Sequence, residues 1–338
     1  MQKNKNKKSK KFLIISSFIF FVFLIMIRKP YGTVDDPKEI KWGVAFSKNF
    51  CGDLGLDWRE TYLALLDDLG VKLIRLPIYW SDAEPEKDKY EFSDYDWMVS
   101  EAEKRGVKLV LAIGRKVPRW PECHIPGWAN LVSEEDQQKE VLEILPQIVS
   151  RYKNSESLYM WQVENEPFLD FGVCPKLDKY FLNKEVAAVK SEDPDHKILT
   201  TDSGELSIWV RAAKRGDVFG TTLYRTLWHS SVGYFTYPIG PRFFWLKANL
   251  VHIFFPGRPL VVSELQAEPW GHKSIQDMTI EEQFRTLSIE HFRANVEYAE
   301  RVAFSEVYLW GAEWWYWMRG KKEHPEFWDY AKSIINFQ

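Results

Sequence analysis

Cysteine and histidine are scarce in this chain of 338 residues, and the usual cofactor-binding motifs are missing. It has three cysteines and seven histidines, with no C-x-x-C pair and no H-E-x-x-H sequence, so no zinc-binding pattern is present. No G-x-G-x-x-G or Walker sequence occurs, so the Gly-rich phosphate turn typical of an open doubly wound sheet is missing. No serine lies in a G-x-S-x-G elbow, which excludes that type of hydrolase. The sequence therefore predicts a protein that works without a metal or another cofactor.

The first 29 residues differ from the rest of the chain in charge and hydropathy. Residues 1–11 include six lysines, and residues 12–27 form an apolar run without charge. At 1.5 Å per residue this run would span roughly 24 Å, slightly short of a hydrocarbon core. Because no small-x-small cleavage site follows, we expect an uncleaved, single-pass membrane anchor, with secretion after signal cleavage as the alternative. The lysines would keep the start of the chain in the cytoplasm and place the remainder outside it.

The remainder of the chain is acidic. Residues 1–29 carry eight positive charges and no negative one, so the overall net charge of −3 leaves −11 on the other residues. An acidic exterior domain is a poor candidate for nucleic-acid binding. We expect residues 1–29 to form the basic tail and anchor, residues 30–40 a linker, and residues 41–338 one large domain. The sequence carries no prediction of the oligomeric state.

From residue 41 onward, strand-like apolar segments alternate with helix-like amphipathic segments. The strand-like segments are residues 41–47, 72–80, 108–114, 159–166, 198–202, 218–224, 259–264 and 307–314. The helix-like segments are residues 57–69, 95–105, 136–152, 179–190, 207–215, 243–255, 280–301 and 327–335. Such alternation implies parallel strands with right-handed crossovers, and eight units predict a (β/α)8 TIM barrel. The alternative is an open doubly wound sheet. It usually carries a Gly-rich phosphate turn, which this sequence lacks, so the barrel is preferred.

Two glutamates stand at the ends of apolar runs. Glu166 lies in the sequence W-Q-V-E-N-E-P at the end of the fourth segment, and Glu264 lies in L-V-V-S-E-L at the end of the seventh. In a barrel both positions belong to the face that carries the active site. Burying a carboxylate without a partner is costly, and two carboxylates facing one cavity are the minimum for hydrolysing a glycosidic bond. Glu164 is a rival to Glu166, because side chains two residues apart on a strand point to the same side.

Further polar and aromatic residues would converge on the same face. Arg75 lies on the second strand, Tyr224 ends the sixth, and Trp310 and Trp314 lie on the eighth, where a spacing of four would place both on one side. Flat aromatic faces suit sugar rings, so one of these tryptophans is expected at the sugar. The aromatic stretch at residues 228–255 could be a lid or a second contact with the membrane.

The loop after the third strand, residues 115–128, is long and aromatic. Loops on this face of a barrel determine substrate choice, so Trp120 and Trp128 are candidate sugar platforms, although either could serve only to clamp the loop. The loop also contains Cys123. Outside the cytoplasm a disulfide is plausible, and Cys174 is the first candidate partner because both cysteines would follow neighbouring strands.

The chain resembles a known enzyme group. N-E-P on the fourth strand, together with a glutamate ending the seventh, resembles the clan A glycoside hydrolases. The second-strand sequence I-R-L-P-I-Y-W resembles that of the cellulase-like family 5, and the resemblance extends over residues 42–337. It implies retaining hydrolysis of β-linked oligo- or polysaccharides through a covalent glycosyl-enzyme.

The resemblance also implies a role for each residue of the motif. Glu166 would be the general acid/base, with a pKa raised by burial and by Glu264, the nucleophile. Arg75 would keep Glu264 ionised and oriented, and Asn165 would hydrogen-bond the sugar 2-hydroxyl. Tyr224 would hydrogen-bond Glu264 or the sugar, and Trp310 would lie under the reacting sugar. Two alternatives remain: a transglycosylase with the same residues, and a non-catalytic carbohydrate-binding barrel.

Overall fold

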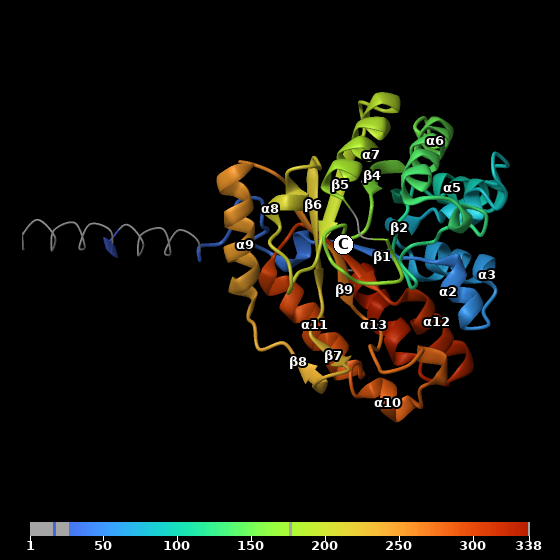
Figure 1. The fold of residues 1–338 in the computed structure, drawn as a ribbon. Coiled ribbons are helices and arrows are strands. Elements are labelled where there is room, and N and C mark those ends of the chain that lie inside the picture. Colours follow the sequence, from blue (N-terminus) through green and yellow to red (C-terminus); the bar gives the residue numbers. More distant parts are fainter. Residues whose placement is uncertain (1–15, 18–26, 176–177, 337–338) are drawn as a thin grey trace, which may run out of the picture.

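The computed structural model describes residues 16–17, 27–175 and 178–336, and within them eight parallel strands close into a barrel. The order of the strands around the barrel is β1-β10-β9-β6-β5-β4-β3-β2. Their bounds are Lys41–Ala45 for β1, Leu73–Pro77 for β2, Lys108–Ile113 for β3, Leu158–Val163 for β4, Lys197–Asp202 for β5, Val218–Leu223 for β6, Leu260–Gln266 for β9 and Glu306–Trp310 for β10. The predicted (β/α)8 barrel is therefore confirmed, with its helices arranged around the strands (Figure 1).

The helices of the described part follow the predicted alternation, but α2, α4 and α12 were not expected, and two crossovers differ in detail. The α-helices are α2 (Lys48–Asp53), α3 (Trp58–Ala64), α4 (Trp80–Ala83), α5 (Ser93–Glu103), α6 (Glu134–Tyr152), α7 (Lys179–Glu192), α8 (Val210–Ala213), α9 (Pro241–Phe254), α10 (Ile280–Phe284), α11 (Ile289–Val302), α12 (Ala312–Lys321) and α13 (Glu326–Ile335). Short 3-10 or π turns are η1 (Pro37–Glu39), η2 (Leu65–Leu69), η3 (Ala129–Leu131) and η4 (Ile275–Asp277). The predicted helix 280–301 is two helices, because Ser288 caps α11 anew through its side chain. The crossover after β6 also contains a hairpin of β7 (Thr226–His229) and β8 (Gly233–Thr236).

Several predicted strands are longer than the observed ones, and one error concerns a candidate site residue. The eighth strand ends at Trp310, and Gly311, at φ 138°, turns the chain into α12. Trp314 therefore lies on a helix, where its Nε1 donates to Gln283 Oε1 at 2.8 Å, and the prediction that it shares a strand face with Trp310 is wrong. The fourth strand likewise ends at Val163, before Glu164 and Glu166.

The core is divided by the wall of the barrel. Residues that alternate outward pack against the surrounding helices in one large apolar cluster. A small second cluster of inward side chains consists of Leu73, Val110, Met160, Leu199, Val218, Val261 and Tyr308. These side chains come from the strands near their amino ends, so they fill the lower half of the barrel. Polar residues two positions further along, such as Arg75 and Gln162, are left facing inward at the carboxyl ends.

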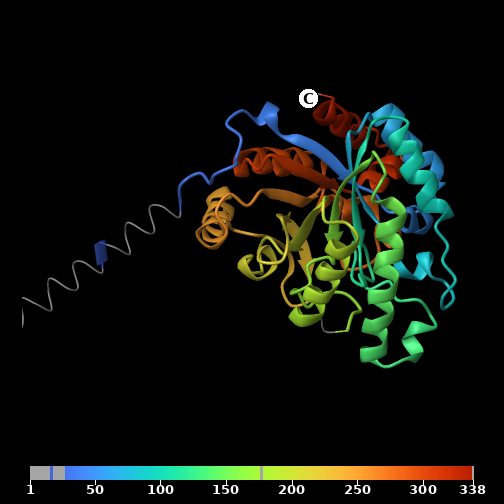
Figure 2. The ribbon, with the colours of Figure 1, turned by 90° about the horizontal axis from the view of Figure 1, so that it is seen from above.

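The segment before β1 runs along the outside of the barrel next to α9 (Figures 1 and 2). Asn249 of α9 donates from its side chain to the carbonyl of Arg28 at 2.8 Å, and the Val34 amide donates to the Ala303 carbonyl at 2.9 Å. Within the described residues, no helix is both long and apolar enough to cross a bilayer. The predicted anchor, residues 12–27, falls outside the described residues except at positions 16, 17 and 27.

Candidate active site

Arg75 of β2 connects three side chains at the carboxyl end of the barrel. Its Nη1 donates to Glu264 Oε1 at 2.6 Å, its Nη2 donates to Asn165 Oδ1 at 2.7 Å, and its Nε donates to Gln162 Oε1 at 2.7 Å. The guanidinium is fully buried, where a charge must be paired and hydrogen-bonded. The predicted partnership of Arg75 with Glu264 is thus present, and Arg75 also holds Asn165 beside them.

Glu264 faces Arg75 because β9 contains a bulge. Thr221 and Thr222 of β6 pair with Val262 and Glu264, so Ser263 is an extra residue without a counterpart in β6. The pairing with β10 shifts over the same stretch. Without the bulge, alternation would turn Glu264 outward with Val262, which belongs to the outer core. The bulge turns the Glu264 carboxylate into the mouth of the barrel. Bulges often lie beside active sites, where they redirect a side chain in this way.

Glu166 lies at the same mouth on the turn that follows β4. Its backbone has φ 41°, in the left-handed region, and its amide donates to Thr201 Oγ1 at 2.9 Å. Its carboxylate oxygen Oε1 accepts a hydrogen bond from Thr222 at 3.1 Å, and 7% of the residue is exposed. Burial, and then the negative charge of Glu264, raise the pKa of Glu166 well above its ordinary value. This is the direction expected from the sequence.

Glu164 has a different surrounding from Glu166. It is fully buried, and its two carboxylate oxygens accept hydrogen bonds from the amides of Arg115 and Lys116, both at 2.7 Å. A Cβ on Gly114, which has φ 121°, would lie 2.5 Å from Glu164 Oε1. Glu164 therefore pins the start of the β3 loop. Its own φ of 58° breaks the alternation on which its rivalry with Glu166 rested.

Tyr224 and Asn165 complete the surroundings of Glu264. The Tyr224 hydroxyl donates to Glu264 Oε2 at 3.0 Å, so both carboxylate oxygens of Glu264 have partners. The Tyr224 amide donates to Glu205 Oε1 at 3.0 Å. The Asn165 side-chain nitrogen donates to Glu122 Oε2 at 3.1 Å. The sequence did not single out Glu122 or Glu205, because neither lies in a periodic segment.

Trp310 is the last residue of β10 and is fixed on two sides. Its Nε1 donates to Glu268 Oε1 at 2.8 Å, and the Arg119 guanidinium lies 4.1 Å from its ring centre. Arg119 also pairs with Glu268 and, at 3.0 Å, with Glu313. Trp310 therefore lies on the predicted strand, and it packs against a buried cluster formed by Arg119, Glu268 and Glu313. Its place under the sugar stays a prediction.

The two predicted platforms of the β3 loop have different environments. Trp128 packs edge-on against Trp80 and donates from Nε1 to the Glu84 carbonyl at 3.0 Å, the contacts of a loop clamp. Its sugar-binding role stays a prediction. Trp120 is 65% exposed and meets Phe171 edge-on.

Trp120 begins a row of aromatic rings that reaches Glu264. Phe171 contacts Trp270 with ring centres 5.6 Å apart, and Trp270 contacts Tyr224 at 5.4 Å. Tyr224 hydrogen-bonds Glu264. The row thus leads from an exposed ring to the buried carboxylate.

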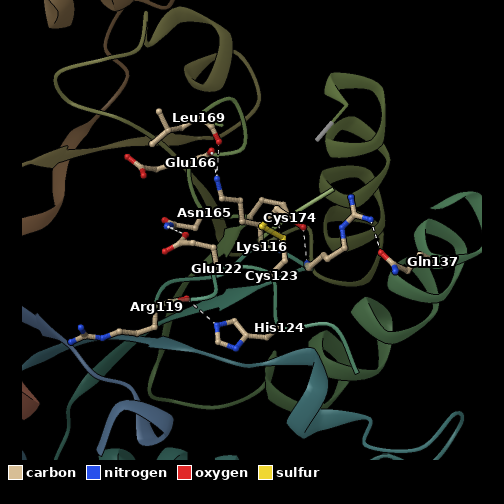
Figure 3. The surroundings of a disulfide bond; sticks show 12 residues. Lys116, Arg119, Glu122, Cys123, His124, Gln137, Asn165, Glu166, Leu169 and Cys174 are labelled. Atoms are coloured by element: carbon tan, nitrogen blue, oxygen red, sulfur yellow. Dashed lines mark hydrogen bonds between the residues drawn. A yellow bond between two sulfur atoms is a disulfide. The ribbon is translucent and has the colours of Figure 1, made fainter. Parts of the chain in front are cut away.

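The predicted disulfide between Cys123 and Cys174 is confirmed (Figure 3). It joins the β3 loop to the segment after Glu166, across 51 positions of sequence. Cys51 is free and buried. In the part of the chain that the structure describes, no group of three or more His, Cys, Asp or Glu residues could hold a metal ion.

The family follows from a comparison with family models. The model of glycosyl hydrolase family 5 (cellulase) matches residues 45–236, more than half of the chain. The chain belongs to this family. The predicted resemblance is therefore confirmed. Arg75, Asn165, Glu166 and Tyr224 of this family 5 chain lie inside the matched span, and Glu264 lies beyond it.

Curated relatives match a shorter part of the family 5 chain. Mannan endo-1,4-beta-mannosidase F of Aspergillus clavatus is 27% identical over 118 residues, which are 32% of this chain and 26% of that protein. The protein of the same name from Aspergillus fumigatus matches with the same identity and coverage. The chain thus spans about a quarter of the length of these relatives.

Solved structures share the fold over most of the chain. Native xylanase 10B from Thermotoga maritima has a TM-score of 0.57 at 16% identity, covering 89% of this chain and 96% of that one. The beta-galactosidase from Rahnella sp. R3 has a TM-score of 0.57 at 13% identity, covering 92% of this chain and 58% of that one.

Proposed function

We propose that this chain is a retaining glycoside hydrolase that cleaves β-linked oligo- or polysaccharides. The observation that carries the proposal is the different environment of two neighbouring carboxyl groups. Glu264 is held by the Arg75 guanidinium, whereas Glu166 accepts from the neutral hydroxyl of Thr222 and has a raised pKa. A pair of carboxyls, one ionised and one protonated, provides a nucleophile and a general acid at once.

The proposed reaction has two steps. In the first, Glu264 attacks the anomeric carbon while Glu166 gives its proton to the leaving oxygen, so the glycosidic bond breaks and a glycosyl ester forms on Glu264. In the second, ionised Glu166 takes a proton from water, and the water oxygen displaces Glu264. The proton taken from water leaves Glu166 protonated again, and its raised pKa favours that state.

The remaining site residues are proposed to bind the sugar. Asn165 would donate to the 2-hydroxyl, and Tyr224 would keep Glu264 oriented through its 3.0 Å hydrogen bond. Trp310 would lie under the reacting sugar. The aromatic row that ends at the exposed Trp120 supports binding of further sugar units, because flat rings stack on pyranose faces.

Mannan is the first polysaccharide to test, because the curated relatives are named for it. Purified protein would be given β-mannan, xylan, cellulose and nitrophenyl β-glycosides, in parallel with the Glu264→Gln variant. We expect sugar release by the native protein and a loss of at least about 10³-fold in the variant. Glu306→Gln is the matched control, because Glu306 is also buried and lies at the opposite end of the barrel. Binding of a glycan by both proteins without release by either would favour the non-catalytic barrel.

We also propose that residues 12–27 anchor the protein in a membrane, with the barrel on the extracytoplasmic side. The disulfide supports this side, because disulfides persist in oxidising compartments. Asn249 holds the carbonyl of Arg28, directly after the apolar run, and the neighbouring side chains Ile253 and Phe254 at the end of α9 are exposed. Protease added to intact cells should cleave the barrel and leave the lysine-rich tail. Release of a shortened protein into the medium would indicate signal cleavage instead.

A further inference from the structure

Glu122 brings a third carboxyl group to the candidate active site, and the proposed reaction does not use it. It lies in the β3 loop next to Cys123, and 6% of it is exposed. Its Oε2 accepts the hydrogen bond from the Asn165 side chain at 3.1 Å, next to Glu166 in sequence (Figure 3). Because burial of a carboxyl is costly, its presence at this place needs a reason.

The backbone around Glu122 is built to hold it there. Its φ of 73° is in the left-handed region, which side chains other than glycine rarely adopt. Its amide donates to the Arg119 carbonyl at 2.7 Å, and its carbonyl accepts from the Val117 amide at 2.9 Å. A Cβ on Gly172 would lie 2.6 Å from the Glu122 Cβ, so the segment before Cys174 leaves no room beside it. Strain of this kind persists where the surroundings over-determine it, and it gathers at functional sites.

Glu122 stabilises the orientation of the Asn165 amide that Arg75 sets. Arg75 can only donate hydrogen bonds, so the Asn165 oxygen must face Arg75 and its nitrogen must face the other way. A carboxylate on that other side accepts from the nitrogen. The bond to Glu122 uses one of the two N–H groups of Asn165 and leaves the other for a sugar hydroxyl. Glu122 therefore extends the chain of contacts that begins with Glu264 and Arg75.

The charge of Glu122 also reaches Glu166. Burial and the negative charge of Glu264 raise the pKa of Glu122 to about 7, against the opposing effects of Lys116, Arg75 and the hydrogen bond from Asn165. Glu122 is in turn one of the charges that raise the pKa of Glu166, after burial and Glu264. The positive charge of Lys116 opposes the rise of both pKa values, and its Nζ donates to the carbonyls of Glu166 and Leu169 at 3.2 and 2.9 Å.

We propose that Glu122 is a positioning residue of this site, which holds the Asn165 amide in its orientation toward the sugar and brings a third carboxyl group to Glu166 and Glu264. The assignment of a sugar as the ligand rests on the proposed function. The hydrogen bond between Asn165 and Glu122 does not depend on it.

The direct test is a titration of Glu166 that needs no substrate. Protein labelled with ¹³C at the glutamate carboxyl is titrated by NMR, and the Glu166 signal is assigned from its loss in Glu166→Gln. In Glu122→Gln, which keeps the size and an acceptor oxygen but removes the charge, we expect the pKa of Glu166 to fall by about 1. An unchanged titration would overturn the proposal. Glu306→Gln, at the far end of the barrel, should leave the titration as in the native protein.

Glu122→Asp is a second variant. It keeps the carboxylate but shortens the side chain by one methylene, which withdraws the carboxylate from Asn165. We expect the pKa of Glu166 to stay within about 0.5 of the native value, with kcat/KM reduced about tenfold on the substrate found active. In Glu122→Gln the basic limb of the kcat/KM profile should move to lower pH. If the native protein cleaves nothing, the proposed function fails, and the NMR titration still decides whether Glu122 acts on Glu166. Native kinetics in both variants would overturn the positioning role.

Discussion

Replacement of Arg75 by methionine should destabilise the protein more than loss of any exposed ion pair. The change removes three hydrogen bonds of 2.6–2.7 Å and leaves the Glu264 carboxylate buried without its counter-charge. Removing one partner of a buried pair costs about 3–5 kcal/mol, because the remaining charge is uncompensated. We therefore expect the free energy of unfolding of Arg75→Met to fall by about that amount at pH 7.

Urea unfolding followed by tryptophan fluorescence measures this loss, and a double variant tests its cause. In Arg75→Met/Glu264→Gln both charges are absent, so the double variant should recover about 2 kcal/mol relative to Arg75→Met alone. Arg59→Met is the control, because Arg59 is 53% exposed in its ion pair with Asp94 and should cost less than about 1 kcal/mol. A loss below about 1 kcal/mol in Arg75→Met, or a double variant that loses the sum of both single changes, would refute the reasoning.

Four further predictions concern the acid, the disulfide, a loop residue and the pH dependence of stability. Glu166→Gln should lower kcat about 10²–10⁴-fold on substrates whose leaving group needs a proton, and much less on dinitrophenyl glycosides; equal losses on both would argue against the acid role. Cys123→Ser should reduce the free energy of unfolding by about 4 kcal/mol, because the disulfide closes a loop of 51 residues, while Cys51→Ala should not mimic it in a thermal scan. Trp128→Ala should lower the free energy of unfolding by about 2–4 kcal/mol with KM changed less than about twofold, whereas a large rise of KM would identify a sugar platform. Burial raises the pKa of Asp202 from 3.8 to about 6. Its contribution to folding is therefore fully present at or below pH 4 and is lost as the pH rises through 6. Asp202→Asn should flatten the resulting fall in the urea midpoint between pH 4 and pH 7.

The barrel and the disulfide could be predicted from the sequence because both depend on the order of the elements. Eight alternations of strand-like and helix-like segments leave few other topologies. Cys123 and Cys174 follow neighbouring strands, so the topology alone brings their loops together. Arg75 lies inside a strand with the inward alternation, and its place in the site follows from that position.

The placement of Glu264 and Glu166 depends on features that periodicity does not contain. Glu264 reaches Arg75 through a bulge at Ser263, and a bulge has no signature in the apolar pattern. Glu164 and Glu166 separate because both have positive φ, which ends the alternation. Glu122 lies in an irregular loop, and only tertiary contacts bring it to Asn165. Apolar residues lie on both sides of Gly311, so the pattern predicts a strand through Trp314 and does not reveal that α12 begins there.

The configuration of the first sugar released is the most direct test of the central claim, that Glu264 forms a covalent intermediate and Glu166 serves it as acid and base. The native protein would be mixed at high concentration with the β-linked substrate found active, and the anomeric proton of the new reducing end followed by ¹H NMR from the first minutes. The two-step mechanism predicts that the β-anomer appears first and then equilibrates. Initial formation of the α-anomer would show direct displacement by water and contradict the mechanism.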